Sequence, residues 1–591
     1  MANEKCIRDP IHNYIYLTDV EFKLIKHPLF QRLRFITQNG AAYYTYPSNR
    51  NCRFLHSLGC MKLGGDIFLN STENLFDMDV KEYLKQAYKM LENIANNNLT
   101  TPICNITKEF ILTKDKTFNK YGLSLWVNES SIQNEMKNEV FQMQFARAVL
   151  FQSVRLACIL HDIGHFPFSH AVERAFSQYL DYLNPKEKEL NDIYIKYNSK
   201  VEYVEKQIHE RIGLGILQEI IPSSEKDFHK LCRHLARIIL IGSHSKYNNI
   251  VHPLYTIISS ELDSDRLDYS LRDPRSSGLE LGAFDIERLL SNFTILKEGE
   301  KFEILPKANA LSSIESFYHQ RFLTYKYLIY HHSKARMDEI VKEITVLLVE
   351  IYNSGDISYG SIKKVLKDYN FSFLWEKCDV GEYYYCNENW YFTILQGIYI
   401  IIQSINKLDD KTTKLKVLIE TFIFRKTENI YSFFKRYDTY FNFMERMYVK
   451  INQLKNIEFN DFEKKMRGVI SDSINNNALK DLNNEFYKQN KVICLITKTD
   501  PKVIKFLKNQ KQPPTSELNV VQQEKSGEKK KVPITVFSPY LQSMGYASEK
   551  EQFFNVFIIK EDIKADIEKG LLEEIKEEFI NFFVLKYKEV L

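Results

Sequence analysis

The sequence CILHDIGHFPFSHAV, residues 158–172, closes a long apolar stretch at residues 141–160, and the two together set our expectation of the fold. Apolar residues in the stretch recur at intervals of three and four, which predicts a buried helix. That helix ends at His161 and Asp162, two side chains that can bind a metal ion. His165 follows one turn later and shares a face with His161.

A second helix is expected directly after this corner. Pro167 cannot continue the first helix, and Ser169 is a suitable N-cap for the next one. His170 and Glu173 are then three residues apart on one face. Three histidines, one aspartate and one glutamate therefore lie within residues 161–173. This density favours a functional site over the alternative, a helix corner whose histidines only make hydrogen bonds in the core.

The remaining metal ligands must come from other parts of the chain, because an open catalytic site takes three or four protein ligands plus water. His56, in CRFLHSLG at residues 52–59, is one candidate because apolar residues surround it. The other is the acidic run ELDSDRLDYSLRD at residues 261–273, which includes Asp265. The alternative interpretation of that run is a solvated helix start with ion pairs along the helix.

The composition excludes several classes of protein. The 591 residues carry 80 Lys and Arg against 76 Asp and Glu, a formal net charge of +4. This near balance argues against a surface that coats nucleic acid or anionic lipid, but not against one basic pocket. The nine cysteines contain no CxxC pair, the N-terminus lacks an apolar signal, and the apolar segment at residues 390–405 is too short to span a bilayer comfortably. We therefore expect a cytoplasmic protein with neither a membrane nor a nucleic-acid partner.

We expect a mostly helical fold with a small α+β unit near the C-terminus, because glycine (20) and proline (15) are sparse and helical periodicity is widespread. The expected organisation is a catalytic domain at residues 1–350 with an insertion at about 70–140, a helical extension at 351–490 and the α+β unit at 491–591. Expected strands lie at 491–497, 532–537 and 553–559, with a β-like run at 117–127. A polar loop is expected at 509–532 and an amphipathic helix at 563–591.

Several motifs occur in a fixed order along the first half of the chain. They are IRDPIHNYIYL (7–17), HPLFQRLRFITQNGAAYYTYPS (27–48), RFLHSLG (53–59), HDIGHFPFSH (161–170), IHE (208–210) and DSDRLDYSLRD (263–273). Together they resemble the HD-domain deoxynucleoside triphosphate (dNTP) triphosphohydrolases, in the branch that contains the mammalian SAM-and-HD-domain enzyme and its bacterial relatives. The matched segments run from about residue 7 to residue 338.

That resemblance implies a role for individual residues. The implied metal ligands are His56, His161, Asp162 and Asp265. The implied catalytic residues are His165, His170, Glu173 and His209. The implied substrate-binding residues are Gln38, Asn39, Arg53, Arg266, Tyr269, Asp273, Arg321 and Tyr330. Gln31 and Arg34 match positions of an allosteric nucleotide site.

The implied reaction is attack of water on the α-phosphorus of a dNTP, which releases inorganic triphosphate and a deoxynucleoside, in a homo-oligomer. The implied cofactor is a divalent metal, and a mixed histidine and carboxylate set accepts Mn, Fe, Zn, Co or Mg. Two alternatives stay open. One is an HD phosphodiesterase or nuclease that acts on cyclic nucleotides or single-stranded nucleic acid, and the other is a nucleotide-sensing scaffold with an inert site.

The sequence departs from that branch at three places. Asn39 replaces a leucine beside the sugar, and Lys26 replaces an aspartate that would accept hydrogen bonds from guanine. The spacing from Arg321 to Tyr330 is one residue longer. Lys26 argues against a guanine nucleotide as the activator and leaves a nucleotide activator of other specificity open.

Overall fold

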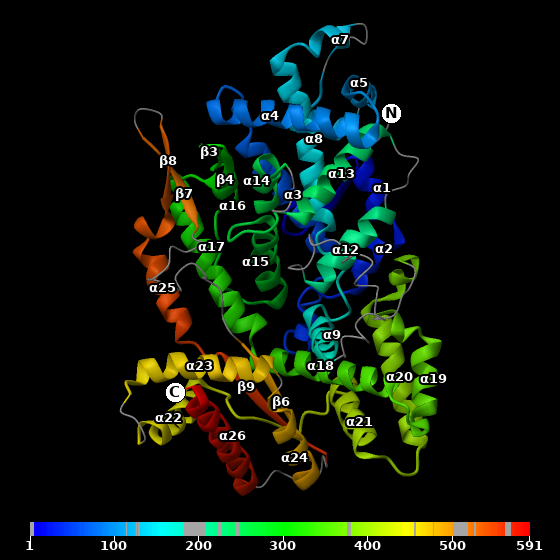
Figure 1. The fold of residues 1–591 in the computed structure, drawn as a ribbon, viewed down its shortest axis with the longest axis vertical. Coiled ribbons are helices and arrows are strands. Elements are labelled where there is room, and N and C mark those ends of the chain that lie inside the picture. The colour runs from blue at the N-terminus through cyan, green and yellow to red at the C-terminus, as the bar shows by residue number, and fades with distance from the viewer. Residues whose placement is uncertain are drawn as a thin grey trace.

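The structure is a computed structural model that describes residues 5–113, 115–125, 127, 131–182, 207–220, 226–242, 247–374, 380–453, 457–476, 478–499, 518–524, 528–561 and 569–590. Helices dominate it, and the strands form only small sheets (Figure 1). The expected fold class is therefore confirmed.

The first half of the chain forms an upper body in the view of Figure 1. Its strands are β1 (Cys6–Asp9), β2 (Asn13–Tyr16), β3 (Phe293–Glu298) and β4 (Lys301–Pro306), paired as two antiparallel hairpins. Its helices are α1 (Asp19–Ile25), α2 (Pro28–Gln31), α3 (Arg53–Ser71), α4 (Met78–Ile94), α5 (Ile103–Thr113), α6 (Lys116–Lys120), α7 (Ile132–Glu135), α8 (Glu139–Leu160), α9 (His170–Tyr182), α12 (Ile208–Glu219), α13 (Asp227–Ile241), α14 (Asn248–Thr256), α15 (Ser264–Ser277), α16 (Ile286–Leu290), α17 (Leu311–Thr324) and α18 (His332–Asn353).

Helix α8 is the centre of the upper body, as its apolar sequence predicts. It packs against α3, α4 and α13, so that apolar side chains are buried on all of its faces. By length and hydropathy α8 is the one helix in the described part of the chain that could cross a membrane. However, 89% of its apolar window is buried inside the protein, which is typical of a core helix.

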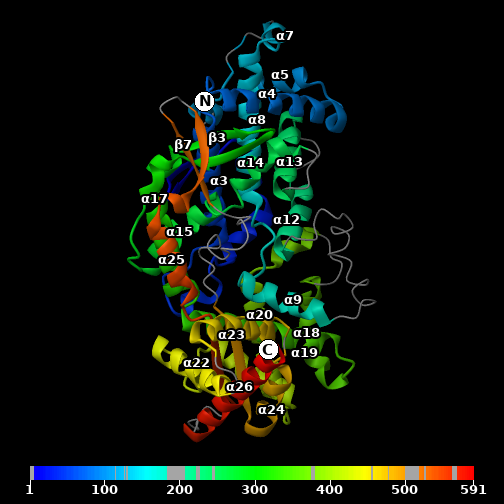
Figure 2. The same cartoon turned by 60° about the vertical axis from the view of Figure 1, so that its left-hand side comes forward.

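The second half of the chain contributes the lower body and, through residues 519–523 and 529–549, one flank of the upper body (Figures 1 and 2), and α18 runs across the molecule between the two bodies. Its helices are α19 (Gly360–Asp368), α20 (Glu388–Ser404), α21 (Asp410–Ile423), α22 (Tyr437–Asn452), α23 (Phe459–Asn475), α24 (Lys480–Asn490), α25 (Pro539–Glu549) and α26 (Lys569–Val590). Its strands are β5 (Ile430–Ser432), β6 (Val492–Lys498), β7 (Asn519–Gln523), β8 (Lys529–Pro533) and β9 (Phe554–Lys560).

A three-stranded antiparallel sheet, in the order β5-β9-β6, organises the C-terminal unit. Side chains from β6 and β9 join those of α22, α23 and α26 in a hydrophobic cluster separate from the main core. The strands expected at 491–497 and 553–559 are confirmed as β6 and β9. Strand β5, which lies within residues 351–490, belongs to the same sheet.

Two expectations about the polar C-terminal segment were wrong in their described part. Residues 500–517 lie outside the described residues, but β7 and β8 pair as a hairpin where a loop was expected. The run at 532–537 is a strand only at its start and then a 3₁₀ turn at Ile534–Val536. The hairpin docks on the upper body because Lys529 pairs with Asp77 and Asp79, and Lys531 with Glu303. The local sequence does not predict these ion pairs, because their partners are far apart along the chain.

The insertion at about 70–140 is helical and packs on α8 through α4. The expectation of a strand at residues 117–127 is wrong for the residues that the structure describes. Asp115 caps a short helix by accepting a hydrogen bond from the backbone of Thr117, and no strand follows in residues 121–125 or at 127. Local capping here outweighs the strand preference of the threonine and the aromatic residues.

Candidate active site

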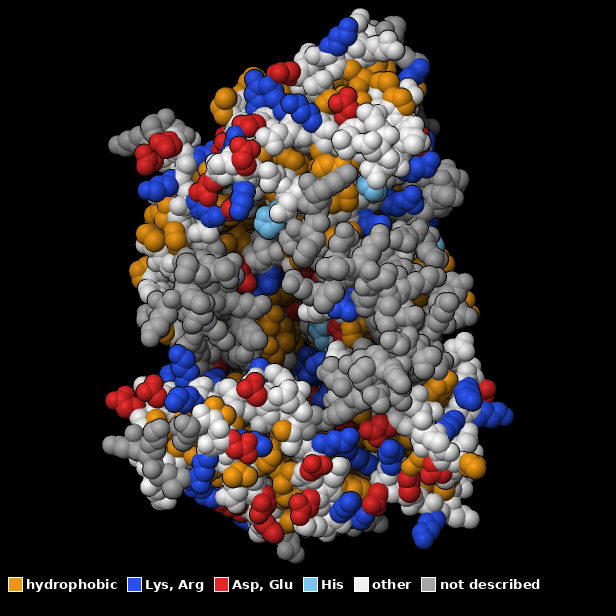
Figure 3. All heavy atoms as spheres, viewed as in Figure 1, with side chains coloured by type: hydrophobic (Ala, Val, Ile, Leu, Met, Phe, Trp, Pro, Cys, Tyr) orange, Lys and Arg blue, Asp and Glu red, His pale blue; other side chains and the backbone are white. Residues whose placement is uncertain are grey.

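A cavity of about 1480 Å³ opens between the upper and lower bodies. Figure 3 shows it as a hollow in the middle of the visible face, with histidine, acidic and basic side chains in its depth. The end of α8, the start of α9 and the first part of α15 line one side, and residues of α18 line another. Ile474, Asn475 and Lys498, from α23 and β6, line it from the C-terminal unit.

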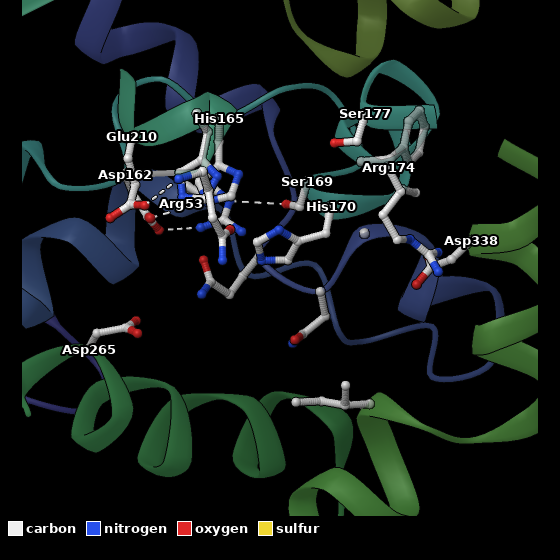
Figure 4. A pocket seen from close by; sticks show the side chains of 18 of the residues that line it. Arg53, Asp162, His165, Ser169, His170, Arg174, Ser177, Glu210, Asp265 and Asp338 are labelled. Atoms are coloured by element: carbon white, nitrogen blue, oxygen red, sulfur yellow. Dashed lines mark hydrogen bonds and ion pairs between the residues drawn. The ribbon is translucent and has the colours of Figure 1, made fainter. Parts of the chain in front are cut away.

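The four predicted metal ligands meet at the upper wall of the cavity, which His161, Asp162 and Asp265 line, and fully buried His56 lies behind them. Nε2 of His56, on α3, lies 2.9 Å from Asp265 Oδ1 and 3.7 Å from Asp162 Oδ2. His161 Nε2 lies 3.4 Å from Asp162 and 3.8 Å from Asp265. These separations match neighbouring ligands around one ion bound at about 2.0–2.2 Å. Figure 4 shows Asp162 and Asp265 on the same side of the cavity, from different elements.

The donor set fits a divalent metal. Among the described residues, Nε2 of His161 is buried without a hydrogen-bond partner. Burial alone would raise the pKa of Asp162, but Arg53 and the neighbouring histidines hold it well below its usual range. Burial would likewise raise the pKa of Asp265, but the hydrogen bonds and charges of His161 and His56 lower it below its usual range. Both carboxylates are therefore ionised at neutral pH. A second four-residue set in the same region includes Cys60, whose Sγ lies 3.4 Å from His56 Nε2.

A close approach of α3 and α15 brings His56 to Asp265. A Cβ at Gly59 would lie 1.8 Å from Asp268 Oδ1, so no other residue fits there without a shift. This contact explains the glycine of RFLHSLG, since only its missing side chain lets the carboxylate of α15 reach the helix.

A buried network behind the metal-ligand group was not predicted from the sequence. Nδ1 of His56 lies 2.8 Å from Asp268 Oδ2, and His12 Nε2 lies 2.6 Å from the other oxygen of Asp268. Arg272 pairs with Asp268 and with Asp9. Such carboxylate contacts fix the orientation of a metal-binding histidine. The sequence signals were the i, i+4 spacing of Asp268 and Arg272 and the motif at residues 7–17, which contains Asp9 and His12 but does not tell what they contact.

The four predicted catalytic residues also form one group. Glu173 lies between two histidines, with Oε2 3.0 Å from His170 Nδ1 and Oε1 2.9 Å from His209 Nδ1. The rings of His165 and His209 stack at 3.8 Å. Burial would raise the pKa of Glu173, but the hydrogen bonds from His170 and His209 lower it far more, so it stays ionised. Burial and the charge of Arg53 lower the pKa of His165, which is therefore neutral.

Most of the predicted substrate-binding residues line the cavity. They are Gln38, Asn39, Arg53, Arg266, Tyr269, Asp273 and Tyr330. Arg53 forms an ion pair with Asp162, and its Nε donates a hydrogen bond of 3.0 Å to Ser169 Oγ (Figure 4). Gln38 Oε1 and Asp273 Oδ1 are buried and accept no hydrogen bond from the described residues. Two acceptors without donors are suited to a ligand that carries hydroxyl groups.

Arg321 is the predicted substrate residue that the structure does not place on the cavity wall. Its Nε donates to the hydroxyl of Tyr269 at 3.0 Å, so it lies behind that ring. Tyr325, which the sequence did not single out, lines the cavity instead. Residues Tyr325–Ile329 form a π-helical turn, which takes up one extra residue and accounts for the longer spacing between Arg321 and Tyr330.

The predicted allosteric residues lie outside the cavity. Gln31 Nε2 donates to the carbonyl of Ile25, and Arg34 donates to Gln31 Oε1 at 2.7 Å. The Arg34 guanidinium lies 3.7 Å from the ring centroid of Phe54. Gln31 and Arg34 thus form a pair of their own at the surface, apart from the proposed metal ligands.

Asp273 makes the stability of the free protein depend on pH. It is 1% exposed, and burial raises its pKa to about 6, from 3.8. Since the folded protein holds this proton more tightly than the unfolded chain, stability falls as pH rises from about 4 to 6. Asp273→Asn should therefore stabilise the ligand-free protein at pH 7.5, by at most on the order of 3 kcal/mol.

Thermal melts of both proteins at pH 4 and pH 7.5 measure this effect. The advantage of the asparagine variant should nearly vanish at pH 4, where Asp273 is protonated in both states. An equal difference at the two pH values would contradict the assigned shift.

Comparisons with known proteins agree with this site. A model of the HD domain matches residues 149–259, which include His161, Asp162 and the catalytic group. An uncharacterised protein of Methanocaldococcus jannaschii is 25% identical over 375 residues, 62% of this chain and 56% of its own length. The deoxynucleoside triphosphate triphosphohydrolase SAMHD1 of Gallus gallus is 22% identical over 405 residues, 66% of this chain and 52% of its own.

A crystal structure of a phosphohydrolase from Bacteroides thetaiotaomicron is also similar, with a TM-score of 0.49 and 17% identity over 94% of this chain and all of that one. The family model thus places an HD domain at residues 149–259, and the donor set of the site is suited to a divalent metal. This chain spans little more than half the length of the archaeal and avian relatives.

Proposed function

We propose that the protein is a metal-dependent dNTP triphosphohydrolase, which converts a dNTP and water into a deoxynucleoside and inorganic triphosphate. The observation that carries the proposal is that one cavity is lined by three of the four metal-competent residues, by the three histidines around Glu173 and by two unpaired acceptors, Gln38 and Asp273. The similarity to the avian enzyme supports the same substrate class.

The proposed metal would be held by His56, His161, Asp162 and Asp265. When bound, it polarises the phosphoryl oxygen and acidifies a water molecule. Arg53 lies beside Asp162 and supplies positive charge for the phosphates in a buried setting, where a guanidinium binds them strongly. Arg266 adds a second guanidinium on the same wall.

Proton transfer falls to His170 and Glu173. The carboxylate of Glu173 holds Nδ1 of His170, which leaves Nε2 of that ring for the reacting group. Figure 4 shows the His170 ring projecting into the open part of the cavity. Neutral His165 lies beside it, with Nε2 3.2 Å from Asp162. The carboxylate-held His170 is therefore our proposed general acid.

A deoxyribose fits the remaining wall. Gln38 and Asp273 can accept a hydrogen bond from the 3′-hydroxyl, which satisfies their buried oxygens. The rings of Tyr269, Tyr325 and Tyr330 line the adjacent surface, where they can pack on the sugar and crowd a 2′-hydroxyl. We propose on this basis that dNTPs are preferred to ribonucleotides.

We further propose a homo-oligomer and a nucleotide activator, which the family resemblance supports, and a cytoplasmic location, which the dispersed cysteines without a CxxC pair support. An activator bound at Gln31 and Arg34 would not compete with the substrate, because neither residue lines the cavity. Lys26 places its ammonium group 4.0 Å from the ring centroid of Phe22 and cannot accept a hydrogen bond, which disfavours guanine.

The test is incubation of the purified protein with Mn, Fe or Mg and each dNTP and rNTP, with the products identified by anion exchange. We expect inorganic triphosphate and deoxynucleoside from at least one dNTP. Release of pyrophosphate or monophosphate, or turnover only of cyclic nucleotides or single-stranded nucleic acid, would overturn the proposal in favour of a phosphodiesterase or nuclease.

A further inference from the structure

The loop that carries the proposed catalytic residues contains an unfavourable backbone. Phe168 and Ser169, directly before His170, both have positive φ angles, 54° and 53°. Residues with a Cβ avoid this left-handed region, and two in succession persist only when neighbouring contacts impose them. The contacts that hold Phe168 and Ser169 therefore determine where His170 and helix α9 begin.

Phe168 and the loop before it contact residues 383–392, here called the strap, which lies outside the segment that matches the HD domain. Tyr383 donates its hydroxyl to the carbonyl of Gly164 at 2.9 Å. Arg32, 2% exposed, joins the strap to the loop by donating to the carbonyls of both Cys386 and His165, at 2.7 and 2.8 Å.

Glu388 makes the contacts nearest the strained pair. Its Oε1 accepts hydrogen bonds from the backbone N–H of Phe168 at 3.3 Å and of Thr37 at 2.8 Å. It also lies 2.6 Å from the Thr37 hydroxyl. The Thr37 carbonyl in turn accepts a hydrogen bond from Ser169 Oγ at 2.9 Å. Ser169 Oγ itself accepts a hydrogen bond from Arg53 Nε. The buried carboxylate of Glu388 is therefore linked to Arg53 by consecutive hydrogen bonds through Thr37 and Ser169.

The strap also holds the side chain of Phe168. That ring is 1% exposed and packs edge-on against Tyr391 and Phe392 of α20 and Phe422 of α21, at 5.3–5.6 Å between centroids. Backbone and ring of Phe168 are therefore fixed by the same helix that begins with Glu388.

We propose that Glu388 is a positioning residue for the catalytic loop: its Oε1 holds Phe168 and Thr37, and thereby fixes the left-handed pair that orients His170 and Arg53. Its effect on turnover rests on the proposed function, whereas its effect on the loop does not. Glutamine keeps the Oε1 acceptor in the same place, and alanine removes it, so the two variants separate the contact from the charge.

The test compares Glu388→Ala, Glu388→Gln and a control, Glu420→Ala. Glu420 is a similarly buried glutamate on α21 that bonds only to Tyr399 and Lys426 in the described residues. The first readout is amide hydrogen exchange of peptides that span residues 163–173, which needs no substrate. Exchange should quicken in Glu388→Ala and stay near the wild-type rate in the other two proteins.

The second readout is steady-state kinetics with the dNTP that wild-type protein hydrolyses best. Glu388→Ala should lower kcat by about 10- to 100-fold, because small misplacements of catalytic groups are costly, with KM and metal content close to wild type. Glu388→Gln should recover most of kcat, and Glu420→Ala should not reduce it.

Three results would overturn the role of Glu388: wild-type exchange of the loop in Glu388→Ala, equal defects in the alanine and glutamine variants, or the same defect in Glu420→Ala. If Glu388→Ala does not fold, Glu388→Asp takes its place, since the shorter side chain withdraws the carboxylate from Phe168 and Thr37, and wild-type exchange of the loop in that variant would overturn the proposal. A wild-type protein that hydrolyses no dNTP sinks the proposed function alone, since the exchange comparison still decides the role of Glu388.

Discussion

A protein that carries His161→Ala together with Asp162→Ala is expected to lose its metal and its turnover at once. The change removes two of the four ligand side chains that converge within 3.8 Å of their neighbours. The two that remain, His56 and Asp265, are too few for a stable open site. Bound metal, measured by elemental analysis after gel filtration, should fall to background, and turnover by roughly 10³-fold or more.

The matched control for this variant is His229→Ala, which removes a buried histidine of α13 that does not line the cavity. That protein should keep its metal. If the double variant still bound metal and hydrolysed substrate, the chemistry would have to move to the separate group around Glu173.

His170→Ala is expected to separate chemistry from metal binding. The ring of His170 is held by Glu173 and is not one of the proposed ligands. Removing a general acid typically costs 10²- to 10⁴-fold in rate, so kcat should fall by about that factor. Metal content should remain at the wild-type level, in contrast to the double variant.

His252→Ala serves as the control for His170→Ala, since His252 is a partly buried histidine of α14 that does not line the cavity. Its kcat should be unchanged. Loss of metal from His170→Ala would mean that His170 is a ligand, and an undiminished kcat would remove it from the proposed proton transfer.

The apolar periodicity and the order of the motifs predicted those features that depend on short stretches of sequence. The apolar period of residues 141–160 predicted α8 and placed His161 and Asp162 at its end. The ordered motifs then indicated that His56 and Asp265 belong to the same site, which the structure brings together. Those expectations needed only a helix face and a motif order.

The missed contacts all depend on partners far apart in the chain. The period of a helix tells which face is buried, but not that His12 meets Asp268 or that Glu388 meets Phe168. Arg321 matched a motif position, yet its guanidinium lies behind Tyr269 because a nearby hydroxyl accepts its hydrogen bond. Motif order therefore identifies the members of a site more reliably than the direction in which each one points.

The cavity wall is shared by two hydrophobic clusters, because Asn475 and Lys498 of the C-terminal unit face the end of α8 across it. A ligand that contacts both sides binds only while both are folded. By linkage, its binding free energy then counts toward the stability of each side. The two clusters already share the C-terminal sheet, since Ile493 belongs to the main core and Val492 to the second cluster. Saturation with such a ligand would therefore strengthen an existing coupling and raise the melting temperature of both sides together.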